Sequence, residues 1–183
     1  MAKKYGDFKI LILGSHYTSD QGSKRNIIKR AKIKVANHEQ LEPIEQLFYL
    51  SVKLKPDYCV YIGLYMNEDR KNLFHRIFEM MLDVHMIIIL LDPKGQGVLV
   101  EHGMCLDKRL RGKTYNYYSQ SQKSDLSGFI KYGTLAHFSN SYEYSDWQDL
   151  YRRILSDINN KRLDIIFPKS ITIDETEISK PLI

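Results

Sequence analysis

Residues 86–91, Met-Ile-Ile-Ile-Leu-Leu, form an unbroken apolar run. A run of this length that ends in Asp-Pro and glycines is typical of a strand buried on both faces of a parallel sheet. The turn after it, residues 92–97, contains Pro93, Gly95 and Gly97. Beyond Gly97 the apolar residues recur with helical spacing. The pattern therefore predicts a strand, a glycine-rich turn and a helix in direct succession.

The same alternation extends along most of the chain. Short apolar runs that end at turn-forming residues predict strands, and apolar residues three or four positions apart predict helices. Strands are expected at 8–13, 33–36, 58–63, 86–91, 113–119 and 134–138. Helices are expected at 24–32, 41–54, 67–84, 97–112, 124–132 and 145–158, the last opened by a capping box of Ser145 and Gln148 and ended by Asn159-Asn160.

Alternating strands and helices at this spacing predict a parallel sheet covered by helices on both faces. We expect one α/β domain over residues 1–160, with a flavodoxin-like sheet of about five strands. Residues 161–183 have a weaker pattern and are expected to form a C-terminal extension or arm.

The composition is that of an ordinary globular protein, with 43% hydrophobic and 27% charged residues among 183. No apolar run approaches the roughly 20 residues of a membrane helix, so no membrane partner is expected. The first residues contain no apolar segment of the signal-peptide type. Cys59 and Cys105 both lie in apolar surroundings, as buried thiols do in a reducing cytosol. We therefore expect a cytoplasmic protein.

The charge is moderately basic, at +5 with a pI of about 9.0. This charge favours anionic ligands such as nucleotides, but it is too small to argue for nucleic acid as a partner. The densest basic segment, residues 24–34, is expected to be the solvated face of a helix. The six histidines show no metal-ligand spacing, so neither a metal site nor a cofactor is predicted.

Two loops are candidates for ligand contact. In an α/β sheet, ligands bind outside the carboxyl ends of the strands, and a helix N-terminus directs partial positive charge at them. The turn at 92–97 and the polar loop at 14–23 both follow predicted strands. Glu101 is expected in about the first turn of the helix after Gly97. A carboxylate there is often only a partner of the helix dipole, and its alternative is a catalytic role.

The segment Gly97-Val-Leu-Val-Glu101-His-Gly103, with Gly112-Lys113 after it, resembles the signature of the nucleoside 2-deoxyribosyltransferase family. That signature is an Asp, a Gly two residues on, a Glu four residues after the Gly, then x-Gly-Tyr-Ala. TIR-like domains and other N-glycosidases share the arrangement of sheet and glutamate. The chain departs from the pattern at Gly95, which stands where the family has its Asp, and in the two residues after Gly103. The resemblance covers residues 86–113.

The resemblance implies an N-glycosidase or deoxyribosyltransferase-like enzyme, a hydrolase or transferase that acts on a nucleoside, a nucleotide or NAD. Cleaving a base from ribose passes through an oxocarbenium-like state, which a carboxylate can stabilise or trap as a glycosyl ester. Glu101 is the residue that meets the motif. The resemblance also points to a homo-oligomer with a shared pocket. The alternative is a non-catalytic nucleotide-binding or protein-interaction module in which Glu101 remains without a catalytic role.

Residues of the two loops complete the expected site. Asp92 can hold sugar hydroxyls or cap the amides of its own turn. Ser15 and His16 can contact a base or a phosphate, with an exposed loop histidine as the alternative for His16. His102 and Cys105 are expected to be structural. The residues expected to bind substrate are Gly14, Ser15, His16, Asp92, Gly95, Gly97 and Gly103.

Overall fold

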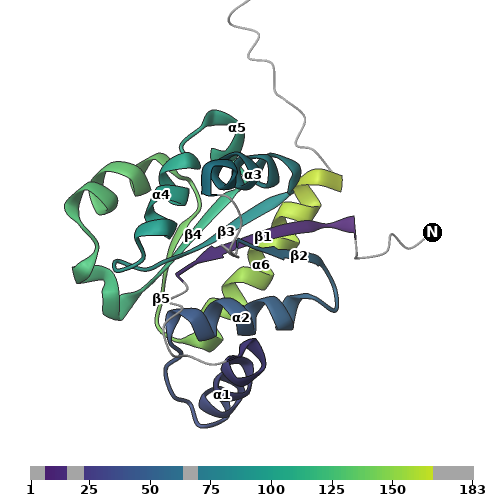
Figure 1. Cartoon of the computed structure of the whole chain (residues 1–183), viewed down its shortest axis with the longest axis vertical. Helices are drawn as coiled ribbons and strands as arrows, with labels where there is room; N and C mark the ends of the chain where they lie inside the picture. Colours follow the sequence, from purple (N-terminus) through teal and green to yellow (C-terminus); the bar gives the residue numbers. More distant parts are fainter. Residues whose placement is uncertain (1–6, 16–22, 64–69, 167–183) are drawn as a thin grey trace, which may run out of the picture.

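The computed structural model describes residues 7–15, 23–63 and 70–166. They form an α/β fold around a five-stranded, all-parallel sheet (Figure 1). Along the sheet the strands lie in the order β2-β1-β3-β4-β5, consistent with the single-domain flavodoxin-like fold that the sequence predicted. The strands are β1 Lys9–Gly14, β2 Cys59–Ile62, β3 Met86–Leu91, β4 Thr114–Ser119 and β5 Ser141–Tyr144.

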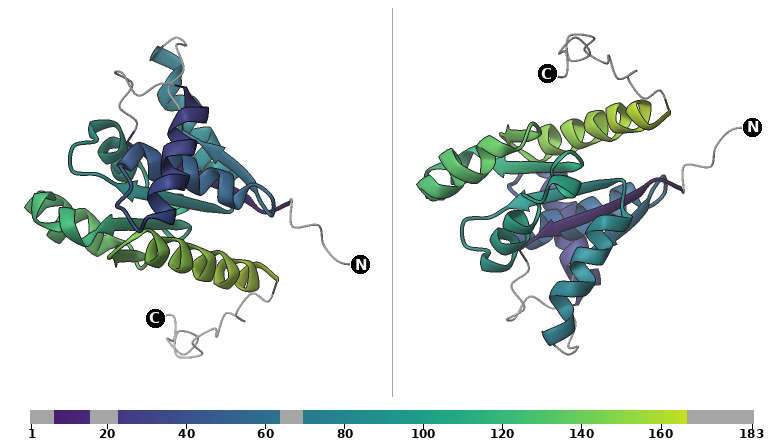
Figure 2. Two further views of the ribbon diagram at one scale, coloured as in Figure 1. Left: turned by 90° about the horizontal axis from the view of Figure 1, so that it is seen from below. Right: turned by 90° about the horizontal axis from the view of Figure 1, so that it is seen from above.

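Helices cover both faces of the sheet. One face carries α2 Pro43–Leu54 and α6 Trp147–Ile166. The other carries α3 Arg70–Asp83, α4 Gln96–Met104, α5 Lys108–Arg111 and three short turns of 3₁₀ or π-helix, η2 Gln120–Asp125, η3 Phe129–Thr134 and η4 Leu135–His137. The right-hand view of Figure 2 shows α6 and α3 on opposite sides of the sheet. No helix within the described ranges is long and apolar enough to cross a membrane.

Strand β3 is buried along its whole length, which confirms the interpretation of its apolar run. Met86, Ile88 and Leu90 enter the core under α2 and α6. The alternate residues Ile87, Ile89 and Leu91 enter the core on the opposite face. Each such side chain contributes about 1.5–3 kcal/mol through burial. A strand in the middle of a two-sided sheet therefore needs apolar residues at every position.

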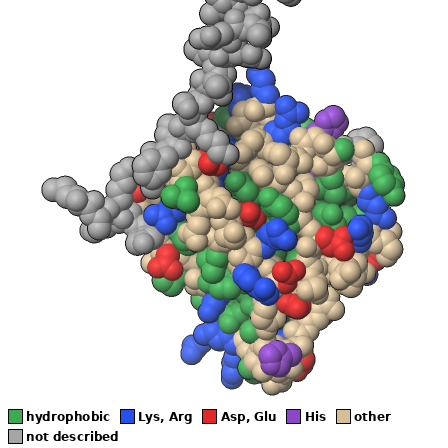
Figure 3. Space-filling view, turned by 180° about the vertical axis from the view of Figure 1, so that it is seen from behind, with side chains coloured by type: hydrophobic (Ala, Val, Ile, Leu, Met, Phe, Trp, Pro, Cys, Tyr) green, Lys and Arg blue, Asp and Glu red, His purple; other side chains and the backbone are tan. Residues whose placement is uncertain are grey.

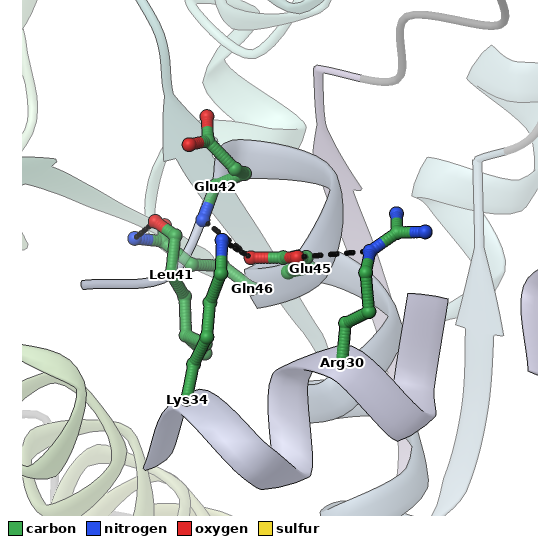
Figure 4. Close-up of polar contacts among 6 residues, drawn as sticks. All are labelled: Arg30, Lys34, Leu41, Glu42, Glu45 and Gln46. Carbon is green, nitrogen blue, oxygen red and sulfur yellow. Dashed lines mark hydrogen bonds and ion pairs between the residues drawn. The ribbon is translucent and has the colours of Figure 1, made fainter. Parts of the chain in front are cut away.

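Helix α1, Lys24–Ala36, forms an outer layer that packs mainly on α2 (Figure 1, bottom). Figure 4 shows Arg30 and Lys34 reaching from α1 to Glu45 of α2. The predicted strand at 33–36 is wrong, because these residues continue α1. Ala31 and Val35 lie one helical turn apart and both pack into the core cluster of α2.

Three predictions on the α3–α5 face are also wrong. The strand expected at 134–138 is the short turn η4, and the fifth strand is β5. Leu135 and Phe138, three residues apart, are both buried in the core on the same face of the sheet, which a helical turn allows and a strand with alternating side chains does not. The helix expected at 97–112 ends at Met104, and Asp107 opens α5 by accepting a hydrogen bond from the Arg109 amide. The helix expected at 124–132 is divided between η2 and η3.

Helix α6 begins and ends later than predicted. Its first turn is capped by Asp146, whose Oδ1 accepts a 2.9 Å hydrogen bond from the amide of Asp149. The Ser145 amide donates a 3.2 Å hydrogen bond to Oδ2 of Asp149, so the cap is built from Asp146 and Asp149 and not from the predicted pair of Ser145 and Gln148. The helix passes through Asn159-Asn160 and reaches Ile166. The Asn67 cap predicted for α3 lies outside the described residues.

Candidate functional site

The sheet changes its direction of winding between β1 and β3. The connection after β1 crosses one face through α1 and α2, and the connection after β3 crosses the other through α4 and α5. Ligands of open parallel sheets bind outside the carboxyl ends of the strands at such a switch point. The register pairs Gly14, the last residue of β1, with Leu90 of β3. The predicted site residues Gly14, Ser15 and Asp92 therefore lie together at the switch point.

Ser15 is packed against Gly95. A Cβ at Gly95 would lie 1.7 Å from Ser15 Oγ and 2.8 Å from Cγ1 of Val98. The backbone φ of Gly95 is −87°, which any residue adopts, so the glycine is required for space and not for its conformation. Ser15 is only 5% exposed, and its hydroxyl is buried without a hydrogen-bond partner in the described part of the chain.

The N-terminus of α4 adjoins this hydroxyl. Gly95 is the N-cap residue and supplies no side-chain cap. The first turn contains no acidic residue either. Amides in the first turn of a helix have no acceptor within the helix, and together they carry partial positive charge. Gln96, Gly97 and Val98 occupy this turn, so their amides and the Ser15 hydroxyl form a group of hydrogen-bond donors.

Asp92 supplies an acceptor to the same corner. Its Oδ1 accepts a 3.0 Å hydrogen bond from the Lys94 amide, the turn-capping role that the sequence offered as an alternative. Its Oδ2 is buried and has no partner among the described residues. Tyr144 lies nearby, and its hydroxyl donates to Gln46 at 2.9 Å. Burial and, secondarily, the charge of Asp92 raise the pKa of Tyr144 to about 12, so its hydroxyl stays protonated.

Glu101 lies deeper than expected. Because α4 begins at Gln96, Glu101 falls in the second helical turn and not the first. The dipole effect falls off within the first turn, which weakens that structural explanation. The side chain is 3% exposed, and its Oε1 lies 3.8 Å from the position of a Cβ at Gly63, the residue after β2. The same Cβ would lie 2.5 Å from Leu13, so Glu101 faces the ends of β1 and β2.

The two carboxylates have neighbours that belong to different faces of the sheet. Asp92 lies toward Tyr144, whose ring belongs to the core under α2 and α6. Glu101 lies toward Leu13, which belongs to the core under α3 and α4. The structure therefore brings Ser15, Gly95 and Asp92 together and sets Glu101 one helical turn away.

The remaining glycines of the motif are less constrained. Gly97 is exposed in the first turn of α4. Gly103 is also exposed, and a Cβ there would meet nothing within 4 Å. No packing contact therefore requires glycine at position 103. His16 lies outside the described residues.

His102 and Cys105 have the structural roles expected of them. His102 is fully buried, and its Nδ1 lies 2.9 Å from Oδ1 of Asn116 on β4. Its ring is tilted against Phe138 at 4.9 Å between centroids. Cys105 is fully buried, and burial raises the pKa of its thiol to about 12. A thiol with that pKa is not a nucleophile at neutral pH.

Sequence reasoning missed three residues of this region, Gly63, Gln46 and Tyr144. Gly63 is the last residue of the strand predicted at 58–63, and that signal alone could have placed it at the same edge as Ser15 and Asp92. Gln46 and Tyr144 had no such signal, because Gln46 lies within a helix and Tyr144 lies in a strand that the pattern did not predict.

In the part of the chain that the structure describes, no three His, Cys, Asp or Glu side chains are grouped to hold a metal ion. In comparisons with known proteins, no family model matches this chain and no curated protein is significantly similar to it.

Proposed function

We propose that this protein is an N-glycosidase or a deoxyribosyltransferase-like enzyme that uses Glu101 to cleave or exchange the base of a nucleoside, a nucleotide or NAD. The observation that carries the proposal is the burial of Glu101, at 3% exposed, beside the ends of β1 and β2 at the switch point. Ligands of parallel α/β sheets bind at this edge, so a carboxylate held here favours a functional explanation. The motif from Gly97 to Gly103 supports the same assignment.

Glu101, Asp92 and Ser15 take different parts in the proposed reaction. As the glycosidic bond breaks, the base leaves with the bonding electrons and takes up a proton, and positive charge develops on the sugar. The Glu101 carboxylate stabilises that charge or bonds to the anomeric carbon as a glycosyl ester, which water or a second base then releases. A site that excludes water strengthens this stabilisation. Oδ2 of Asp92 is an acceptor for a sugar hydroxyl, and the hydroxyl of Ser15 is a donor.

One observation favours a second candidate, a nucleotide-binding module without catalysis. Asp92 and Glu101 lie toward different sides of the switch point, so a ligand held by Ser15 and Asp92 does not need to reach Glu101. In that case the buried acceptor and donor serve binding alone.

Base release from a panel of nucleosides, nucleotides and NAD, followed by chromatography, tests the proposal. Glu101→Gln keeps the size of the side chain and removes its negative charge. We expect this variant to lose turnover by about 100-fold to 1,000-fold, while calorimetry shows ligand affinity and folding nearly unchanged. Glu79→Gln is the matched control, because Glu79 is 62% exposed on α3.

The outcomes separate the two candidates. A wild-type protein that binds a member of the panel and releases no base supports the binding module. A Glu101→Gln protein that turns over at the wild-type rate contradicts the assignment of Glu101.

A further inference from the structure

The positive charge of the protein is concentrated in α1. Six of the 27 basic residues of the chain lie within this helix, Lys24, Arg25, Lys29, Arg30, Lys32 and Lys34, and it contains no acidic residue. The rest of the chain then holds 21 basic and 22 acidic residues. The net charge of +5 therefore understates the local charge, because α1 alone accounts for the whole excess. Figure 3 shows Lys and Arg side chains projecting from the lower edge of the molecule, where α1 lies.

Three of these cations make contacts within the fold, and the other three face outward. Arg30 and Lys34 pair with the buried carboxylate of Glu45. Lys24 lies over the ring of Phe48, at 5.4 Å from its centroid. Arg25, Lys29 and Lys32 are exposed, and none of them has an acidic partner among the residues described. These last three form what we call the basic stripe.

The basic stripe has a regular geometry. Its residues are spaced at i, i+4 and i+7, so they share one face of the helix within about 10 Å along its axis. An open groove runs beside them, and Lys24, Arg25, Asn26, Ile28, Lys29 and Lys32 line it. Phosphates of one nucleic-acid strand recur at about 3.4 Å along the duplex axis, so the stripe matches a run of about three phosphates.

We propose that the basic stripe of α1 binds the phosphate backbone of a nucleic acid. The proposal is independent of the glycosidase assignment, because α1 packs on α2 and lies outside the layer that covers the sheet. The contacts are of the phosphate-positioning kind, so binding is insensitive to base sequence and weakens steeply with salt.

An anionic membrane would satisfy the same charges, but the helix is unsuited to it. A helix that binds at a membrane surface inserts an apolar face between the lipids. The apolar face of α1, with Ile27 and Ala31, is already buried in the protein. Ile33, at 53% exposed, is the large apolar side chain of α1 that remains accessible. The stripe therefore favours nucleic acid.

Fluorescence anisotropy with labelled single-stranded DNA, single-stranded RNA and duplex DNA of about 20 nucleotides, measured from about 50 to about 200 mM salt, tests this proposal. The test variant is Arg25→Gln/Lys29→Gln/Lys32→Gln. Its matched control is Lys55→Gln/Lys108→Gln/Arg111→Gln, which removes the same charge from exposed positions outside α1. Thermal melting verifies that both variants are folded, and Lys29→Gln alone provides a milder change.

We expect the wild-type protein to bind all three oligonucleotides at low salt. The test variant should bind at least about tenfold more weakly, with the salt slope for single strands reduced by about 2. Lys29→Gln should reduce the slope by about 0.7, and the control variant should bind within about twofold of wild type. Absence of wild-type binding at low salt overturns the proposal, as does equal weakening by the two triple variants. Tighter binding to phosphatidylcholine vesicles with about 30% phosphatidylserine than to any oligonucleotide also overturns it.

Discussion

The hydroxyl of Ser15 occupies the space that a side chain at Gly95 would need, since a Cβ at Gly95 would lie 1.7 Å from Ser15 Oγ. Ser15 follows directly after β1 and Gly95 is the N-cap of α4, so this contact fixes the separation between two residues that are 80 positions apart in the sequence. The family resembled by the motif has an Asp at the position of Gly95. In this chain an Asp there would collide with Ser15, so the departure from the signature follows from the packing of the corner.

Gly95→Ala tests that contact. We expect the added methyl group to displace Ser15 or Val98 and to cost about 1–3 kcal/mol of unfolding free energy, the usual penalty for overpacking. Ligand affinity should fall at the same time, because the displaced group is the donor at the N-terminus of α4. Urea unfolding and calorimetry with the ligand panel measure the two effects. Adding Ser15→Ala to this variant should restore part of the stability.

Gly103→Ala is the matched control for Gly95→Ala, since it adds the same group eight residues further along the chain, within α4, where a Cβ would meet nothing within 4 Å. An alanine within a helix is more favourable than a glycine by roughly 0.5–1 kcal/mol. We therefore expect Gly103→Ala to raise the melting temperature. Equal losses of stability in the two variants would contradict the steric explanation of Gly95.

The central strand and its turn could be predicted because their own residues determine their conformation. A strand buried on both faces requires an apolar residue at every position, and the run at 86–91 has no other simple explanation. The topology then places the residues after β1 and β3 at one edge, which brings Ser15 and Asp92 together. The depth of Glu101 could not be predicted, because it depends on whether α4 begins at Gln96 or a turn later.

The errors lie where tertiary contacts decide between two local patterns. Residues 32–36, Lys-Ile-Lys-Val-Ala, alternate as a strand does, but α2 offers a surface for Ala31 and Val35 on one helical face. The last strand, Ser-Tyr-Glu-Tyr, has no aliphatic residue to mark it. It is specified by pairing with β4 and by the burial of Tyr144, and neither is visible from its own residues.

Trp147 anchors α6 to the rest of the protein. It is 7% exposed, with its ring stacked on Tyr151 at 5.8 Å and tilted against Tyr49 of α2 at 5.0 Å. Trp147→Ala should cost about 3–5 kcal/mol, the usual range for a buried aromatic residue. Chemical denaturation followed by circular dichroism measures the loss. Leu163→Ala, at a position 54% exposed on the same helix, should change stability by less than about 0.5 kcal/mol.

His102 makes the stability depend on pH. Burial lowers its pKa below the ordinary value of 6.5, although the hydrogen bond that Asn116 Oδ1 accepts from the ring opposes the shift. The unfolded chain therefore takes up a proton at a pH where the folded protein does not. The contribution of neutral His102 to the stability of the folded protein is therefore complete above about pH 6.5. It decreases as the pH falls through the pKa that His102 has in the folded protein. Melting temperatures at pH 7.5 and at pH 5.5 (roughly one unit above and below this point) should differ less for His102→Gln than for wild type. His75→Gln, at a site 76% exposed, should leave the difference unchanged.

Glu45 attaches α1 to α2, and its removal provides the last prediction. The carboxylate is 2% exposed and accepts hydrogen bonds from Lys34 at 2.9 Å, from the Glu42 amide at 2.9 Å and from Arg30 at 3.5 Å. Glu45→Gln should cost about 1–3 kcal/mol, because the buried side chain loses the negative charge that its two cationic partners bind. Of the two partners, Lys34 is the closer and is 26% exposed, whereas Arg30 is 45% exposed and more fully screened by solvent. Lys34→Gln should therefore destabilise the protein more than Arg30→Gln.

Urea unfolding with an unchanged m-value measures these differences in unfolding free energy. Glu39→Gln, at an exposed position, is the control. A larger loss for Arg30→Gln than for Lys34→Gln would show that distance and burial do not set the strength of this attachment.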